Sequence, residues 1–135
     1  DRLKIAERLA AQRPAHLPAL NVCLQVNVSG EASKSGVTPA ELPALAQAVA
    51  ALPGLRLRGL MCIPEATDDL PRLREQFACL PTLQAALAAD GLVLDTLSMG
   101  MSADLELAVA CGSTLVRVGT AIFGGRSASA PLATA

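Results

Sequence analysis

Aromatic side chains are nearly absent from this 135-residue chain, which has two Phe, no Tyr and no Trp. An excess of either charge is absent as well, because 11 basic residues are balanced by 12 acidic ones and the net charge is −1. Surfaces that bind nucleic acid combine excess positive charge with aromatic stacking platforms, so the composition argues against a nucleic-acid partner. No apolar run approaches the ~18 residues that cross a bilayer, which argues against a membrane span.

Metal-ligating and disulfide-forming patterns are also missing. The four cysteines lie far apart without C-x-x-C spacing, and the chain has a single histidine, His16. A zinc site and a disulfide framework are therefore both weakly supported. We expect the four cysteines to be buried, reduced thiols, and the protein to be cytoplasmic; they are Cys23, Cys62, Cys79 and Cys111.

What the chain does contain is 52% hydrophobic residues against only 17% charged ones, which excludes a disordered protein. Strand patterns fall at residues 21–28, 55–63, 92–98 and 115–119. Helical patterns fall at residues 1–13, 38–52, 70–90 and 102–111, with a short helical turn at 120–123. Asp1 and Ser102 are the predicted N-caps of the first and fourth helices.

Strands that alternate with helices predict an α/β fold with a parallel sheet covered by helices. Four such units are too few to close a barrel of eight, so we predict half of a (β/α)8 TIM-type barrel with four parallel strands; a small open α/β domain is the alternative. The half-barrel would occupy residues 1–126, with a disordered tail at 127–135. Exposed hydrophobic edge strands predict self-association of the half-barrel.

The last predicted strand carries an arginine among apolar neighbours. Val116 and Val118 point to one side, so Arg117 points to the other, into the barrel. A buried guanidinium needs an acceptor of fixed geometry. That acceptor is either an internal carboxylate, with Asp95 as the candidate, or a ligand.

The residues around Arg117 favour an anionic ligand. Gly119 lets the backbone approach a bound group, and Thr120 begins a short helix, whose free N–H groups attract anions. In barrels the anion bound at such a place is often a phosphate. Ser98, at the end of the third strand, can donate its hydroxyl to the same anion. Gln25 and Asn27 are open to two interpretations, as ligand contacts or as polar residues that satisfy each other.

Residues 96–126, TLSMGMSADLELAVACGSTLVRVGTAIFGGR, closely resemble the signature of the pyridoxal 5′-phosphate homeostasis proteins, and the resemblance continues back through LRGLMCIP, LQVNVSGEASKSGV and DRLKIAERL. It implies a barrel like the N-terminal domain of alanine racemase, with pyridoxal 5′-phosphate attached to a lysine. Ser98, Gly119 and Thr120 match positions that hold the phosphate. Arg117 matches the arginine that faces the pyridine nitrogen.

The family's lysine-bearing first strand, similar to A-V-S-K-T-K-P, has no counterpart here, and neither do its F-G-E-N and H-F-I-G segments. The chain has only Lys4 and Lys34, and neither matches the cofactor lysine. The chain therefore resembles the C-terminal half of the family, and its start at Asp1 leads us to expect a piece of a longer protein.

For the whole protein, the resemblance implies a cytoplasmic carrier that binds and buffers pyridoxal phosphate, not an enzyme with turnover. One alternative is a fragment of an amino-acid racemase of the same fold. Such an enzyme often needs a tyrosine as a second acid or base, and this chain has none. A second alternative is a half-barrel that binds a sugar phosphate without a covalent bond.

Overall fold

The computed structural model describes residues 1–125 and contains a three-stranded parallel sheet in the order β1-β2-β3. The strands are β1 (Leu20–Gln25), β2 (Leu55–Met61) and β3 (Thr96–Ser98). The α/β class with a parallel sheet is thus confirmed, whereas the prediction of four strands is wrong within these residues. The predicted tail, residues 127–135, lies outside the described residues.

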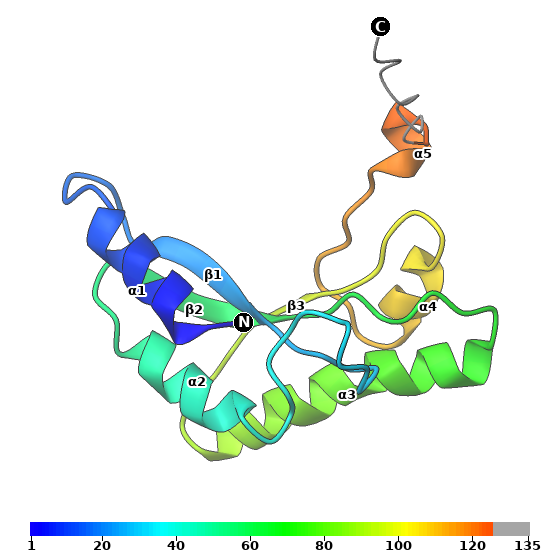
Figure 1. Cartoon of the computed structure of the whole chain (residues 1–135), viewed down its shortest axis with the longest axis horizontal. Helices are drawn as coiled ribbons and strands as arrows, with labels where there is room; N and C mark the ends of the chain where they lie inside the picture. The colour runs from blue at the N-terminus through cyan, green and yellow to red at the C-terminus, as the bar shows by residue number, and fades with distance from the viewer. Residues whose placement is uncertain (126–135) are drawn as a thin grey trace, which may run out of the picture.

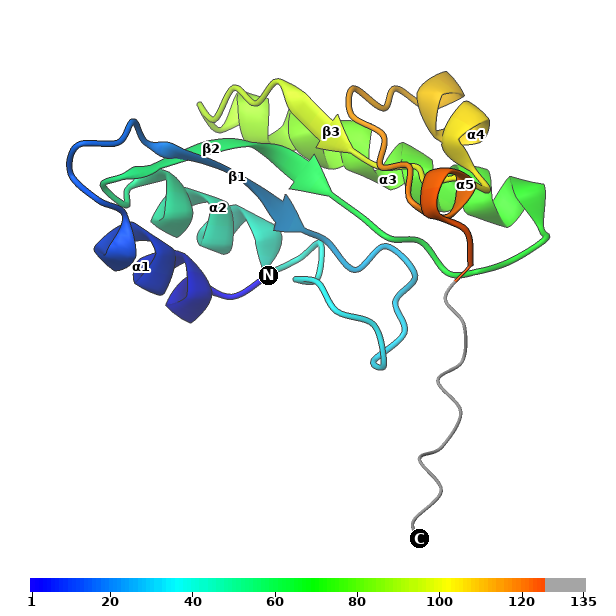
Figure 2. The same cartoon turned by 90° about the horizontal axis from the view of Figure 1, so that it is seen from above.

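Three helices cover one side of the sheet: α1 (Leu3–Gln12), α2 (Leu42–Ala50) and α3 (Leu70–Ala89) (Figure 1). They follow one another across the sheet in the same order as the strands (Figure 2). Two shorter helices, α4 (Leu105–Ala110) and α5 (Thr120–Phe123), complete the described residues, and α5 confirms the predicted turn. Each of these helices is either too short or too polar to cross a lipid bilayer.

The hydrophobic core lies between the sheet and these helices. Leu24, Leu60 and Leu97 contribute one buried side chain from each strand. Phe77 of α3 and Leu42 of α2 are fully buried against them. The helix-facing side of the sheet is therefore the packed side, as expected for a parallel sheet with amphipathic helices.

Both predicted N-caps are wrong. Arg2 occupies the N-cap position of α1, and the Asp1 carboxylate instead accepts a hydrogen bond from the Gly36 N–H at 3.2 Å. Asp104, not Ser102, precedes α4. Ser102 Oγ accepts from the Ala121 N–H at 3.2 Å, which ties the loop before α4 to α5.

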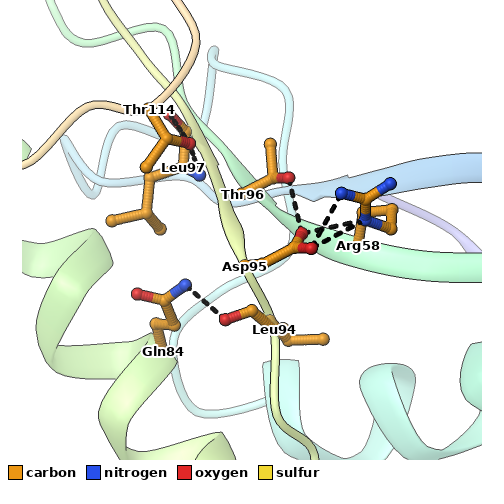
Figure 3. Close-up of polar contacts among 7 residues, drawn as sticks. All are labelled: Arg58, Gln84, Leu94, Asp95, Thr96, Leu97 and Thr114. Atoms are coloured by element: carbon orange, nitrogen blue, oxygen red, sulfur yellow. Dashed lines mark hydrogen bonds and ion pairs between the residues drawn. The ribbon is translucent and has the colours of Figure 1, made fainter.

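All three strands are shorter than their patterns predict, and next to β1 and β3 the backbone that would extend the strand makes other hydrogen bonds. Beyond β1, the Asn27 backbone N–H donates to the Val37 carbonyl at 2.9 Å, so the chain pairs with the end of its own loop. Before β3, the Leu94 carbonyl accepts from Gln84 of α3 at 2.8 Å (Figure 3). These backbone groups hold loops in place instead of extending the sheet.

Residues 115–119 lie beside β3 without forming the fourth strand. They make one isolated parallel bridge, between Ser98 and Leu115, and the Arg117 N–H donates to the Gly100 carbonyl at 3.0 Å. Gly100 adopts a φ of 95°, a left-handed conformation that interrupts an extended chain. Residues 115–119 are thus neighbours of β3, but β3 ends too early to support a regular ladder.

Candidate functional site

Arg117 is half-buried beside the carboxyl ends of β2 and β3. Its Nη2 donates to the Cys62 carbonyl at 3.0 Å. Within residues 1–125 no carboxylate forms an ion pair with it. The internal pair between Arg117 and Asp95, one of the two interpretations of the sequence, is therefore wrong.

Asp95 pairs with a different arginine. Arg58 of β2 binds it through three hydrogen bonds, with Nε at 2.9 and 3.1 Å and Nη2 at 2.7 Å (Figure 3). The hydrogen bonds from Arg58 and from the Thr96 hydroxyl lower the pKa of Asp95 to about 2, and the same pairing raises the pKa of Arg58. Arg58 and Asp95 thus satisfy each other, and Asp95 is not available to Arg117.

The Nε atom of Arg117 is buried and has no hydrogen-bond partner among the described residues. A buried donor without an acceptor costs about 1–3 kcal/mol, and more when it belongs to a charged group. A guanidinium has only donors, so its partner must be an acceptor. The geometry thus suits an acceptor atom supplied from outside residues 1–125.

Ser98 lies next to this arginine. It is 6% exposed, pairs with Met61 across the sheet, and bridges to Leu115, two residues before Arg117. Its carbonyl accepts from the Cys62 N–H at 3.2 Å. The structure therefore brings Ser98 and Arg117 together around Cys62.

Sequence reasoning missed the part played by Cys62, because the atom that holds Arg117 is a backbone carbonyl and carries no residue signature. The Cys62 side chain is fully buried. Burial raises the pKa of its thiol to about 12, although the charge of Arg117 opposes this shift. The thiol is neutral at physiological pH, so it gives Arg117 no ionic partner. The other three cysteines are half-buried and form no disulfide within residues 1–125; they are Cys23, Cys79 and Cys111.

Gly119 and Thr120 form a second, more exposed group. Gly119 stands at the N-cap position of α5, and a Cβ added to it would meet no atom within 4 Å. A shallow hollow beside it is lined by Met101, Ser102, Ala103, Thr120 and Ala121. Ser98 and Arg117 are not among its lining residues, so residues 1–125 hold the four predicted site residues as two adjacent pairs.

Asn27 and Gln25 bond within their own loop. The Asn27 Oδ1 accepts from the Ser29 hydroxyl and from the Gly30 N–H at 3.2 and 3.1 Å. Gln25 donates to the Ser35 carbonyl at 3.4 Å. Their polar groups are engaged by the loop that follows β1, which favours the structural interpretation over ligand contact.

Comparisons with known proteins converge on one family. The sequence profile described as "Alanine racemase, N-terminal domain" matches residues 1–127. The pyridoxal phosphate homeostasis protein of Pseudomonas aeruginosa is 63% identical over 131 residues, which are 97% of this chain and 56% of that protein. The protein of the same name from Escherichia coli K12 is 55% identical over 129 residues, 96% of this chain and 55% of its own length. The chain thus spans about half the length of the curated relatives it matches.

Solved structures agree with the sequences. PipY of Synechococcus elongatus, with pyridoxal phosphate bound, superposes with a TM-score of 0.81 at 37% identity, covering 92% of this chain and 58% of that one. Alanine racemase of Corynebacterium glutamicum gives a TM-score of 0.67 at 20% identity, covering 90% of this chain and 34% of that one, and shares the fold alone.

Proposed function

Because the chain belongs to the alanine racemase N-terminal-domain family, we propose that it supplies the phosphate and ring-nitrogen side of a pyridoxal 5′-phosphate site. In this proposal residues 1–126 form the C-terminal half of a barrel, and the whole cytoplasmic protein binds and buffers the cofactor. The observation that carries the proposal is the buried Arg117 Nε without a partner. The names of the relatives and the ligand of PipY support the choice of cofactor.

Arg117 selects one form of the ring nitrogen. The cofactor supplies a reactive aldehyde and a ring that accepts electrons best when its nitrogen is protonated. Arg117 only donates hydrogen bonds, so the nitrogen it binds must carry no proton. Such a site keeps the ring a weak electron sink, which suits a carrier better than an enzyme that stabilises carbanions.

Ser98, Gly119 and Thr120 would hold the phosphate. The Ser98 hydroxyl is a donor beside Arg117, and the Thr120 N–H has no acceptor within residues 1–125. Gly119 leaves open space where a phosphate oxygen can approach the backbone. Hydrogen bonds from neutral donors to a charged phosphate are stronger than those between neutral groups.

We further propose that this chain binds the cofactor without a covalent bond. Its two lysines, Lys4 on α1 and Lys34 in the loop after β1, are exposed, and neither matches the cofactor lysine of the family. Pyridoxal phosphate should therefore bind reversibly, with no lysine labelled at stoichiometry after borohydride treatment. Peptide mass mapping checks this, and complete labelling of either lysine at low cofactor excess would refute it.

Replacing Gly119 with alanine is expected to weaken pyridoxal phosphate binding about tenfold while leaving the free energy of unfolding unchanged. The new Cβ meets nothing in the free protein, and the φ of −120° suits alanine, but the methyl group would occupy space next to the phosphate. Fluorescence titration measures the affinity, and urea denaturation measures the stability.

The control ligands are pyridoxal, which lacks the phosphate, and a simple sugar phosphate, which lacks the ring. Gly119→Ala should change the affinity for pyridoxal little. If the sugar phosphate binds the original chain as tightly as pyridoxal phosphate, the site recognises phosphate alone and the proposed ligand is wrong.

A further inference from the structure

The segment that leads to Arg117 is held to β3 by two side-chain hydroxyls as well as by backbone. The Leu97 N–H donates to the Thr114 hydroxyl oxygen at 2.8 Å (Figure 3). The Leu97 carbonyl accepts from the Thr114 N–H at 3.0 Å. The Ser113 hydroxyl donates to the Met99 carbonyl at 2.6 Å. Hydroxyl groups thus supply bonds that a regular strand would make through its backbone.

Ser98 lies between the two residues that these hydroxyls bind. Its own carbonyl points the other way and accepts from the Cys62 N–H at 3.2 Å. In a parallel sheet the backbone groups of successive residues bond to opposite sides, so the chain at Ser98 is fixed from both sides. A strand side chain stands roughly perpendicular to the sheet, so the direction of the Ser98 hydroxyl follows from this backbone.

Few other contacts set the distance between Ser98 and Arg117. The Met99 N–H donates to the Leu115 carbonyl at 3.1 Å, and the Arg117 N–H donates to the Gly100 carbonyl at 3.0 Å. The two segments share one isolated bridge, between Ser98 and Leu115, in place of a ladder. A short set of backbone bonds opens more readily than a full ladder, so the added hydroxyl bonds matter for this distance.

Resting on the proposed function, we infer that Ser113 and Thr114 are positioning residues of the cofactor site. Neither touches the ligand. They fix the spacing between the Ser98 hydroxyl, which would bind the phosphate, and Arg117, which would bind the ring nitrogen. The cofactor carries both groups at a nearly fixed separation, so its affinity depends on a site that holds the matching spacing before the ligand arrives.

Substitution of Thr114 in the full 135-residue chain tests this inference. Thr114→Val removes the acceptor of the Leu97 N–H at nearly constant volume, and Thr114→Ser keeps a hydroxyl as the matched control. Thr114→Val should raise the dissociation constant of pyridoxal phosphate about fivefold, and Thr114→Ser should change it less than about twofold.

Ser113→Ala, with Ser113→Thr as its control, should act in the same direction and serves if Thr114→Val does not fold. Circular dichroism reports whether each variant is folded. Unchanged affinity in the folded alanine or valine variants would overturn the inference.

A double-variant cycle distinguishes positioning from a general loss of stability. Because Thr114 acts through Ser98 in this inference, Thr114→Val should change the affinity less than about twofold once Ser98→Ala has removed the hydroxyl. Equal losses of affinity with and without Ser98→Ala would show that Thr114 acts elsewhere, and would overturn the inference.

Amide hydrogen exchange without cofactor tests the spacing apart from the proposed function. Thr114→Val should speed exchange about tenfold or more at Leu97, which loses its acceptor, and also at Met99 and Arg117, whose N–H groups join the two segments. Slow exchange at Met99 and Arg117, as in the original chain, would overturn the inference. If the original chain does not bind pyridoxal phosphate, the proposed function is wrong, and exchange alone decides whether Thr114 holds the two segments together.

Discussion

Replacing Arg117 with glutamine is expected to weaken pyridoxal 5′-phosphate binding by about ten- to a hundredfold. Glutamine retains hydrogen-bonding ability at this position but loses the positive charge and the Nε donor. A hydrogen bond from a charged group contributes about 1.5–3 kcal/mol, which corresponds to this range of affinity. Titration of the cofactor, followed by the cofactor's own absorbance and fluorescence, measures the change at constant pH and salt.

Arg58→Gln is the matched control, because it removes an arginine of the same sheet whose donors already bind Asp95. Its affinity for the cofactor should stay within about twofold of the original, since a surface ion pair contributes little to the rest of the protein. Equal losses in Arg58→Gln and Arg117→Gln would show that general positive charge, rather than Arg117, attracts the ligand. An unchanged affinity in Arg117→Gln would contradict the proposed contact with the ring nitrogen.

The side to which Arg117 points could be predicted from the alternation of Val116, Arg117 and Val118, because Arg117 is half-buried and the two valines are exposed. The partner of Asp95 could not. Asp95 faces Arg58 because β2 and β3 pair with Gly59 opposite Thr96. Periodicity within each strand carries no information about this register. The sequence analysis therefore considered Arg117 as the partner of Asp95, whereas the structure pairs Asp95 with Arg58.

Helix ends show the same limit. A carboxylate or hydroxyl near a helix start can bond any nearby N–H, and the sequence does not say which one the fold brings closest. Asp1 reaches Gly36, 35 residues away, and Ser102 reaches Ala121. By contrast, α3 begins where the pattern predicts, because Asp69 bonds the N–H of Arg72 within its own first turn. Local contacts were predictable, and distant ones depended on tertiary structure.

The largest loss of stability is expected for Gly59→Ala, which should lower the free energy of unfolding by more than about 4 kcal/mol. A Cβ at Gly59 would lie 1.7 Å from the Thr96 carbonyl oxygen and 2.5 Å from its carbon. Both are backbone atoms of β3, so no side-chain rotation relieves the overlap. β2 and β3 would have to separate or shift register, and the buried Leu60 and Leu97 beside them would move too.

Urea denaturation followed by circular dichroism measures this effect, and two other glycines calibrate it. Gly119→Ala introduces no contact within 4 Å and should leave the unfolding midpoint unchanged. Gly91→Ala also has open space, but the φ of 90° disfavours alanine, so a loss of about 1 kcal/mol is expected. A Gly59→Ala protein as stable as Gly119→Ala would show that β2 and β3 do not pack as closely as described. Because Cys62, the residue after β2, bonds the backbone of Ser98 and the side chain of Arg117, it would also remove the structural basis for placing Cys62 in one site with them.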